Sequence, residues 1–422
     1  MVQVPGAQVP GAQVPRPQVP RPQVPGIRCM MASGWLALFV SAASSVVALA
    51  GSAAAQDVPS FYTAGPQEIA GRPGTIIRQE ALTGSVPEGA KAWRLLYRST
   101  GLDGEPVAAS AVLVVPDGAP PADGVPVVSW QHPTSGVDRL CAPSLSRDVL
   151  KMIMGLPELL KRGYAVVAPD YPGLGTPGPH PYLVGESEGH AVLDAVRAAR
   201  NAPEAHAGQR FAVWGHSQGG HATLFAGLLA QSYAPELQLV GVAAAAPASE
   251  LDKLFGAVAD TPDEQLFSAL LMSAWSGVYD ISLDRLVAAS DQPAVETLAH
   301  VCFDPPMDSD TQPPDAAMPD AGYKMLNPIG KTQPWSSLAA HNTAGVLPAG
   351  VPAFLAQGSA DTTIAPEVTA DYMARLCKAG VSVRMVEKPG VVHRLIAREA
   401  ADEAVGWIGD RFAGLPAPSD CP

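Results

Sequence analysis

The sequence predicts an α/β fold in which a mostly parallel central sheet carries helices on both faces and a helical cap is inserted into the chain. Three observations favour this class: an antiparallel start, short apolar runs that alternate with helical patterns, and one long interruption of that alternation. The chain has 422 residues, of which 47% are hydrophobic, so it can form one large core or two ordinary ones.

The chain begins with a segment that we expect to lie outside the fold. Residues 1–29 repeat a five-residue unit that starts Gln-Val-Pro, which is typical of a disordered extension upstream of the true start. Residues 30–55 then have the features of a secretory signal peptide, an apolar run followed by Ala53 to Ala55. Cleavage near Ala55 predicts a secreted or periplasmic product. The alternative, an uncleaved anchor, is disfavoured because the run is shorter than the ~20 residues of a membrane span.

The expected fold starts after Gln56 with an antiparallel hairpin, Trp93–Ser99 and Val107–Val115. Short apolar runs that suit buried parallel strands follow: Val125–Gln131, Tyr164–Pro169, Phe211–Gly215, Leu239–Ala246, Pro352–Gly358 and Val381–Glu387. Helical patterns lie between or after them: Ser144–Leu160, Glu188–Ala199, Gln218–Ala230, Pro366–Lys378 and Glu399–Phe412.

The alternation stops once, for about a hundred residues, which is far longer than an ordinary connection. We interpret residues 247–351 as a cap, and residues 56–246 and 352–422 as the core. The expected elements of the cap are two helices and a proline-rich loop: Ala259–Ser276, Leu283–His300 and Asp304–Pro319. The cap would lie above the carboxyl edge of the sheet, where ligands bind in folds of this kind.

A five-residue motif indicates the candidate nucleophile. Residues 215–219 read Gly-His-Ser-Gln-Gly, which fits G-x-S-x-G, and they lie between a predicted strand and a predicted helix. This is the context of the nucleophile elbow, a sharp turn that exposes a serine hydroxyl. We therefore expect Ser217 to be a nucleophile, which needs a base held in place by an acid.

The acid and the base should follow the nucleophile along the chain, in that order. Asp361 comes directly after the predicted strand Pro352–Gly358, and His393 comes after the last predicted strand. His393 is the only histidine downstream of Asp361, so we expect Asp361 to be the acid and His393 the base. A turn or helix-capping role is the alternative for Asp361.

Two backbone N–H groups are expected to bind the oxyanion of the tetrahedral intermediate. Gln218, directly after the nucleophile, is the first expected donor. The second should come from the loop after Val125–Gln131, where Pro133 has no N–H, so that Thr134 or Ser135 donates, with Thr134 preferred. A plain turn residue is the alternative for Thr134.

The remaining patterns narrow the class of protein. The net charge is −13 and no basic stripe is present, which excludes a nucleic-acid binder. Residues 173–178 fit G-x-G-x-x-G, but their prolines prevent the helix that a dinucleotide site requires. We expect no cofactor and no metal. An even number of cysteines after the cleavage site predicts two disulfides in one of three pairings: Cys141, Cys302, Cys377 and Cys421.

Together these motifs resemble the secretory lipase family of cap-bearing α/β-hydrolases. The resemblance rests on the elbow, the cap, Asp361, His393 and three short stretches: Ser129–His132, Cys141–Ser144 and Asp170–Gly175. It implies an α/β-hydrolase fold, hydrolysis of carboxylic esters and a mobile cap that lines an acyl pocket. It also implies the disulfides Cys141–Cys302 and Cys377–Cys421.

We therefore expect a secreted serine hydrolase, either a triacylglycerol lipase or a carboxylesterase, that works through an acyl-enzyme intermediate. Its partner would be an ester substrate, with lipid and polyester surfaces both open, and neither nucleic acid nor a stable membrane span is expected. An acyltransferase or a peptidase could use the same three residues. A catalytically inactive binding module is the alternative from a different class. Oligomeric state and chain-length preference stay open.

Overall fold

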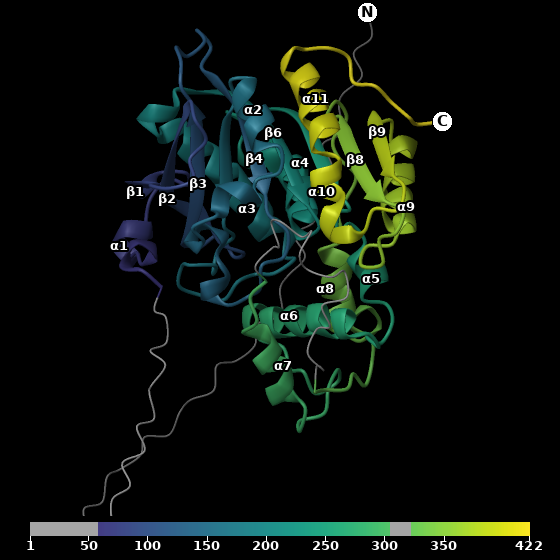
Figure 1. Cartoon of the computed structure of the whole chain (residues 1–422). Coiled ribbons are helices and arrows are strands. Elements are labelled where there is room, and N and C mark those ends of the chain that lie inside the picture. The colour runs from purple at the N-terminus through teal and green to yellow at the C-terminus, as the bar shows by residue number, and fades with distance from the viewer. Residues whose placement is uncertain (1–57, 304–321) are drawn as a thin grey trace, which may run out of the picture. The chain divides into compact units, whose positions relative to one another are not determined.

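The computed structural model describes residues 58–303 and 322–422, so the predictions for residues 1–55 and for the loop Asp304–Pro319 lie outside it. Its centre is a nine-stranded sheet in the order β1-β2-β3-β5-β4-β6-β7-β8-β9. The strands are β1 Ile76–Ala81, β2 Ala90–Thr100, β3 Pro106–Pro116, β4 Val125–Gln131, β5 Ala165–Pro169, β6 Ala207–His216, β7 Gln238–Ala245, β8 Ala353–Gly358 and β9 Val383–Lys388. Figure 1 shows this sheet, with most of its strands labelled.

The sheet is antiparallel at one end and parallel over the rest. Strands β1, β2, β3 and β5 pair antiparallel, whereas β4 pairs parallel with both β5 and β6, and the parallel pairing continues to β9. The predicted mostly parallel sheet is therefore confirmed. One strand, β1, was not predicted. It is an edge strand that pairs only with β2, and three of its six residues, Ile-Ile-Arg-Gln-Glu-Ala, are polar, so it lacks the continuous apolar run of the central strands.

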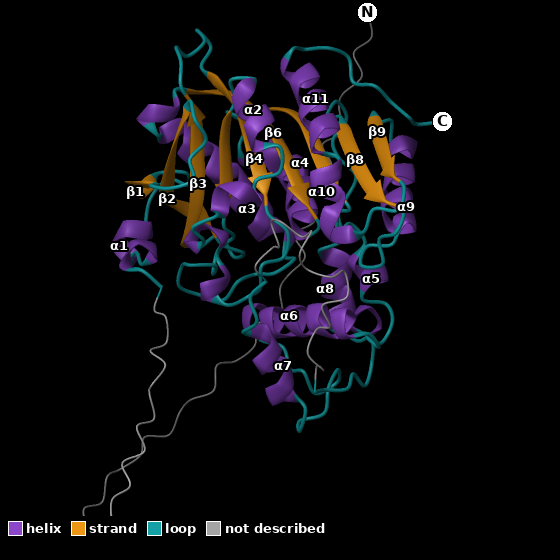
Figure 2. Ribbon diagram, in the orientation of Figure 1, coloured by secondary structure: helices purple, strands orange, loops and turns teal. Residues whose placement is uncertain are grey.

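Helices cover both faces of the sheet (Figure 2). One apolar cluster packs α3 and α4 against one face, and a second packs α2, α10 and α11 against the other. Val127 and Val128, neighbours in β4, belong to different clusters because successive strand residues point to opposite faces. The helix bounds are α1 Pro66–Ile69, α2 Leu156–Lys161, α3 Gly185–Asn201, α4 Gln218–Tyr233, α9 Pro366–Lys378, α10 Ile396–Glu399 and α11 Ala401–Phe412.

The prediction of one helix over Ser144–Leu160 was wrong. Only α2 at its end is α-helical, and two short 3-10 turns precede it. Gly155, just before α2, has a left-handed φ of +79°, which interrupts a helix. Upstream, the Ser144 N–H donates to the buried carboxylate of Asp170 at 3.1 Å. This contact ties the segment before α2 to the end of strand β5.

The predicted cap segment contains four helices within its described residues: α5 Leu251–Leu254, α6 Pro262–Tyr279, α7 Gln292–Ala299 and α8 Trp335–His341. Thr261 starts α6 with a capping box, in which its side chain accepts from Glu264 N. The second predicted helix, Leu283–His300, was too long. Only α7 forms, since Val287 instead makes a β-bridge with Met325.

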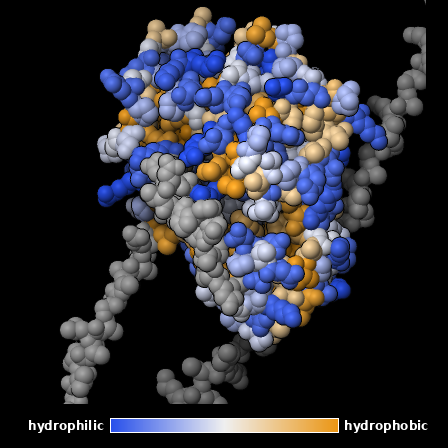
Figure 3. All heavy atoms as spheres, turned by 45° about the vertical axis from the view of Figure 1, so that its right-hand side comes forward, coloured by the Kyte–Doolittle hydropathy of each residue, from blue (hydrophilic) through white to orange (hydrophobic). Residues whose placement is uncertain are grey.

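Aromatic residues hold these helices together close to the sheet edge. The rings of Trp275 in α6 and Trp335 in α8 stack with centroids 6.3 Å apart. Trp275 Nε1 also donates to the Tyr182 carbonyl at 2.8 Å, which ties α6 to a loop of the core. Figure 3 shows one face of the surface, where hydrophobic residues alternate with hydrophilic ones. No helix among the described residues is long and apolar enough to cross a membrane.

Candidate active site

Ser217 lies at the turn between β6 and α4, as the motif predicts. Its backbone has φ +56° and ψ −117°, a conformation that L-residues rarely adopt and that surrounding structure must enforce. The Ser217 N–H donates to the Ala245 carbonyl of β7 at 3.0 Å, which helps to hold the turn. The strained turn carries the serine out of strand β6 at the carboxyl edge of the sheet.

The two glycines of the motif allow this turn because no side chain fits at either position. A Cβ on Gly215 would lie 2.2 Å from the Gly219 carbonyl oxygen. A Cβ on Gly219 would lie 2.0 Å from the Gln131 carbonyl oxygen of β4. Both distances are far below van der Waals contact. The glycines therefore let α4 start directly against the ends of β4 and β6.

The structure brings His393 and Asp361 to the serine. His393 Nε2 lies 2.8 Å from Ser217 Oγ, and His393 Nδ1 lies 2.7 Å from Asp361 Oδ2. Asp361 follows β8 and is buried, whereas the His393 side chain stays 14% exposed. Three residues that are far apart in sequence thus form one continuous chain of contacts.

The Asp361 carboxylate is held by donors on its own loop and on strand β8. Oδ1 accepts from the N–H groups of Thr363 at 2.9 Å and Ile364 at 2.8 Å, and Oδ2 accepts from Gln357 Nε2 at 3.1 Å. These contacts aim the carboxylate at His393 Nδ1. A proton on Nδ1 leaves the lone pair on Nε2 facing the serine hydroxyl, which is the arrangement that can remove the hydroxyl proton.

His216, next to the nucleophile, packs on the base, with ring centroids 4.8 Å apart. It is buried, and this burial, with the nearby His393, lowers the pKa of His216 well below its ordinary value. A neutral His216 places no charge beside the base. No cluster of residues suited to a metal occurs among the described residues.

The two candidate oxyanion donors flank the same cavity. Gln218 is the first residue of α4, and Thr134 lines a cavity that also contains Ser217 and Gln218. The Thr134 hydroxyl lies 2.9 Å from the Tyr182 hydroxyl. Ser135, the other candidate, lines a different hollow beside the disulfide. The geometry therefore favours Thr134 over Ser135 as the residue nearer to the nucleophile.

Buried contacts fix the loop that carries Thr134. The His132 Nδ1 lies 2.6 Å from the Pro133 carbonyl, and the Tyr171 hydroxyl donates to the His132 carbonyl at 3.2 Å. Burial lowers the pKa of His132, so that its imidazole stays neutral. The contact of His132 with Pro133 therefore helps to orient this loop.

The cavity in front of Ser217 has a volume of about 280 Å³. Core and cap both contribute to its wall, and most of the cap contribution is apolar. The hydrophobic residues of the lining are Leu183, Ala248, Leu254, Phe255, Ala257, Val258, Ala259, Phe267 and Ile364. Such a lining can receive an apolar group that is attached to the carbonyl at Ser217.

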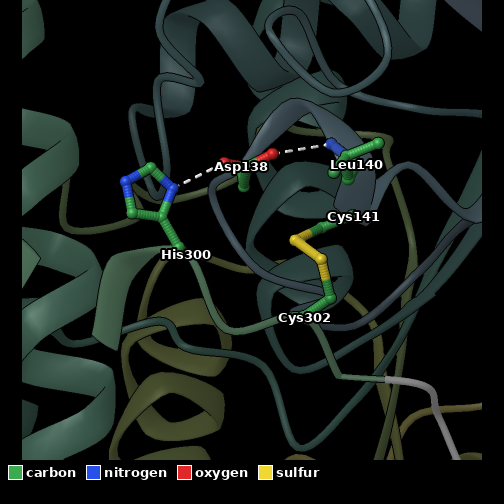
Figure 4. Close-up of a disulfide and its surroundings, with 5 residues drawn as sticks. All are labelled: Asp138, Leu140, Cys141, His300 and Cys302. Atoms are coloured by element: carbon green, nitrogen blue, oxygen red, sulfur yellow. Dashed lines mark hydrogen bonds and ion pairs between the residues drawn. A yellow bond between two sulfur atoms is a disulfide. The ribbon is translucent and has the colours of Figure 1, made fainter. Parts of the chain in front are cut away.

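The disulfides join Cys141 to Cys302 and Cys377 to Cys421. This is the pairing that the family resemblance implies. The first bridge links the segment after the Thr134 loop to the chain that follows α7 (Figure 4). Beside it, His300 Nδ1 lies 2.6 Å from Asp138 Oδ2, and Asp138 Oδ1 accepts from the Leu140 N–H at 2.9 Å.

The sequence did not predict the buried pair of Glu188 and His221 behind the elbow. Glu188 in α3 and His221 in α4 are both buried, and Glu188 Oε2 lies 2.7 Å from His221 Nδ1. Glu188 was included in a predicted helix but was given no function. The one signal for it in the sequence is a carboxylate on a helix face whose residues one turn away, such as Ala191 and Val192, are apolar.

The nine-stranded sheet and the elbow define the class: the protein is an α/β-hydrolase. Solved structures agree on this fold. The closed state of Candida antarctica lipase A matches with a TM-score of 0.70 and 22% identity over 85% of this chain and 88% of that chain. A rice cell wall degrading esterase of Xanthomonas oryzae matches with a TM-score of 0.63 and 21% identity over 82% and 99% of the two chains.

The family model described as secretory lipase matches residues 148–420, and the chain belongs to this family. Membership makes it an ester hydrolase. Lipase 6 of Candida albicans is 27% identical over 92% of this chain and 88% of the relative. A probable inactive lipase of Mycobacterium tuberculosis is 31% identical over 43% of this chain, and the chain spans 44% of the length of that relative.

Proposed function

We propose that the protein is a secreted serine hydrolase that cleaves carboxylic esters through an acyl-enzyme intermediate. The observation that carries the proposal is the contact of 2.8 Å between Ser217 Oγ and His393 Nε2, with Asp361 held behind the imidazole. In this proposal Ser217 is the nucleophile, His393 the general base and acid, and Asp361 the residue that orients the imidazole and stabilises its charge.

In the first half-reaction, Ser217 Oγ attacks the ester carbonyl carbon and its proton passes to His393 Nε2. The carbonyl oxygen becomes an oxyanion, which accepts hydrogen bonds from the backbone N–H groups of Gln218 and Thr134. When the intermediate collapses, the ester C–O bond breaks and His393 gives its proton to the leaving alcohol. Water then attacks the acyl-enzyme with His393 as base, which releases the acid and restores Ser217.

The cavity can receive an apolar acyl group. Its volume of about 280 Å³ is larger than that of a cavity of about 150 Å³ that holds one benzene molecule. Each methylene that it buries contributes ~0.8 kcal/mol. Longer acyl chains should therefore bind more tightly until the cavity is filled, and a series of esters measures that length.

Secretion follows from the signal-like segment of residues 30–55, and two disulfides fit an oxidising compartment. Expression of the full chain in a bacterial host with an intact export system tests this directly. The expected product is exported and has an N-terminal residue near Gln56 by mass spectrometry. A product that keeps residues 30–55 and stays in the cytosol would overturn the proposal of secretion.

The catalytic proposal is tested with p-nitrophenyl esters from acetyl to palmitoyl. Ser217→Ala should lower kcat/KM by at least ~10⁴-fold, because the nucleophile is removed. Ser249→Ala is a matched control: Ser249 is buried nearby, and its hydroxyl has no hydrogen-bond partner within the described chain. Its activity should stay within twofold of wild type. An active Ser217→Ala variant, or a folded wild type that hydrolyses none of these esters, would refute the proposal.

A further inference from the structure

The buried carboxylate of Glu188 contacts three groups behind the active site. Oε1 accepts from Gln218 Nε2 at 2.8 Å and from the Leu183 N–H at 3.0 Å, while Oε2 lies 2.7 Å from His221 Nδ1. Glu188 is 1% exposed, and His221 is fully buried. A carboxylate in such a place is costly unless its partners compensate for the lost hydration.

We propose that Glu188 is a positioning residue for the oxyanion side of the active site, acting through the side chain of Gln218 and the backbone of Leu183. The inference rests on the proposed function, in which the Gln218 N–H binds the oxyanion. Glu188 touches neither the substrate nor Ser217 in this proposal. Its effect is to fix two parts of the cavity wall relative to the nucleophile.

Both amide hydrogens of Gln218 have a buried acceptor. One faces Glu188 Oε1, and the other faces His180 Nε2 at 3.1 Å. His180 Nδ1 lies 3.0 Å from the Pro172 carbonyl and must donate to it, which leaves Nε2 as an acceptor. Burial lowers the pKa of His180 to about 3, so the imidazole keeps this role at neutral pH. The side chain of Gln218 is thereby anchored at both amide hydrogens.

The anchored side chain belongs to the first residue of α4, whose N–H has no partner within the helix. Rotation of the peptide between Ser217 and Gln218 would turn this N–H away from the oxyanion. Because the anchor holds Gln218 from the α3 side, it restricts that rotation. A donor that is fixed before the reaction stabilises the transition state without a cost of reorganisation.

The contact with Leu183 holds a second part of the cavity wall. Leu183 has φ +52°, which is unfavourable for a side chain of its size. Its N–H donates to the same Glu188 oxygen that accepts from Gln218, and Leu183 and Gln218 both line the cavity. One carboxylate oxygen therefore sets the distance between these two parts of the wall.

Proton counting shows how Glu188 stays satisfied without net charge. His221 Nε2 lies 2.8 Å from the Asn342 carbonyl, which can only accept, so Nε2 carries a hydrogen. One further proton lies between His221 Nδ1 and Glu188 Oε2. The pair is therefore neutral overall, whichever partner holds that proton. Asn342 Nδ2 in turn donates to the Tyr279 hydroxyl of α6 at 3.0 Å, which connects this pair to the cap.

The test compares four variants of the full chain by kcat and KM on p-nitrophenyl octanoate. Glu188→Ala removes the anchor, and Gln218→Ala removes the anchored side chain but keeps the backbone donor. We expect each to lower kcat roughly 10- to 100-fold with KM changed less than threefold. Glu188→Gln keeps an acceptor for Gln218 and Leu183 and allows a neutral His221, so it should recover most of the loss. Glu186→Ala, exposed on the same helix, should match wild type.

The double variant Glu188→Ala/Gln218→Ala should lose less kcat than the product of the two single losses, because the contact between Glu188 and Gln218 is broken in both single variants. Losses that multiply, or an unchanged kcat in Gln218→Ala, would overturn the inference. If Glu188→Ala does not fold, the kcat values of Gln218→Ala and Glu188→Gln test the inference. Stoichiometric labelling with a fluorophosphonate distinguishes a failure of the proposed function from a failure of the role proposed for Glu188. A wild type that is not labelled at Ser217 refutes the proposed function, whereas labelled variants with unchanged kcat refute only the role of Glu188.

Discussion

Removal of one disulfide should impair catalysis, whereas removal of the other should impair only stability. In the chain-entropy model, a bridge across 161 residues stabilises the fold by ~5 kcal/mol and a bridge across 44 residues by ~4 kcal/mol. For a protein of this size, loss of either bridge should therefore lower Tm by ~5 °C. The paired variants are Cys141→Ala/Cys302→Ala and Cys377→Ala/Cys421→Ala.

The difference in activity follows from what the first bridge contacts. Cys141 Sγ packs against the backbone of Gly136: a Cβ added to Gly136 would lie 2.5 Å from the sulfur. The Phe303 N–H, next to Cys302, donates to the Ser135 carbonyl at 2.9 Å. Both contacts fix the loop that presents the Thr134 N–H. Without the bridge, displacement of this loop by an ångström or less should lower kcat roughly tenfold.

The assay is kcat and KM on one p-nitrophenyl ester at 20 °C, where both variants stay folded, with thermal unfolding measured in parallel. We expect similar losses of Tm in the two paired variants but a loss of kcat only in the one that lacks Cys141–Cys302. Equal kcat losses in both, or a wild-type kcat without Cys141–Cys302, would refute the idea that this bridge positions the Thr134 loop.

Three further predictions concern single residues. Gly219→Ala should lower the free energy of unfolding in urea by at least ~2 kcal/mol, because its Cβ would meet the Gln131 carbonyl. Gly406→Ala is the control: the space around Gly406 is open, so this substitution should stabilise α11 by ~0.5–1 kcal/mol. Asp361→Asn should lower kcat ~10⁴-fold by favouring the wrong imidazole tautomer, and an active variant would contradict this role. Burial lowers the pKa of His180 to about 3, so below pH 6.5 the unfolded chain binds a proton that the fold does not. Stability should therefore fall by up to ~1.4 kcal/mol per pH unit as the pH drops from 6.5 toward 3, with a smaller slope in His180→Gln.

The sequence predicted those elements whose signal is local. Strand β4 and helix α9 have the predicted bounds, because a continuous apolar run and a proline at the helix start determine them. The helix expected over Ser144–Leu160 failed in part because Gly155 takes a left-handed φ and Pro157 has no N–H, so α2 begins only at Leu156. The position of Ser144, by contrast, depends on Asp170 at the end of β5, a tertiary contact that no local pattern contains.

In the candidate site, too, the residues that belong to a motif were predicted and those that meet only through packing were not. The elbow motif and the chain order of this fold indicated Ser217, Asp361 and His393, and the structure brings these three together. Glu188 and His221 were not identified as partners, because they are 33 residues apart on different helices and neither belongs to a motif. Only the packing of α3 on α4 makes them neighbours.

Three locally unfavourable features lie at or behind one cavity. Ser217 and Leu183 both have positive φ, and Glu188 is a buried carboxylate that contacts the backbone of Leu183 and the residue after Ser217. Each feature alone would destabilise the fold by about 1–3 kcal/mol. Structure of this kind persists when neighbouring contacts enforce it. The Ala245 carbonyl holds the elbow from β7, while Glu188 contacts the N–H of Leu183 and the side chain of Gln218. In the role proposed for it, one buried side chain therefore supports the residue after the nucleophile and the strained Leu183 at the same time.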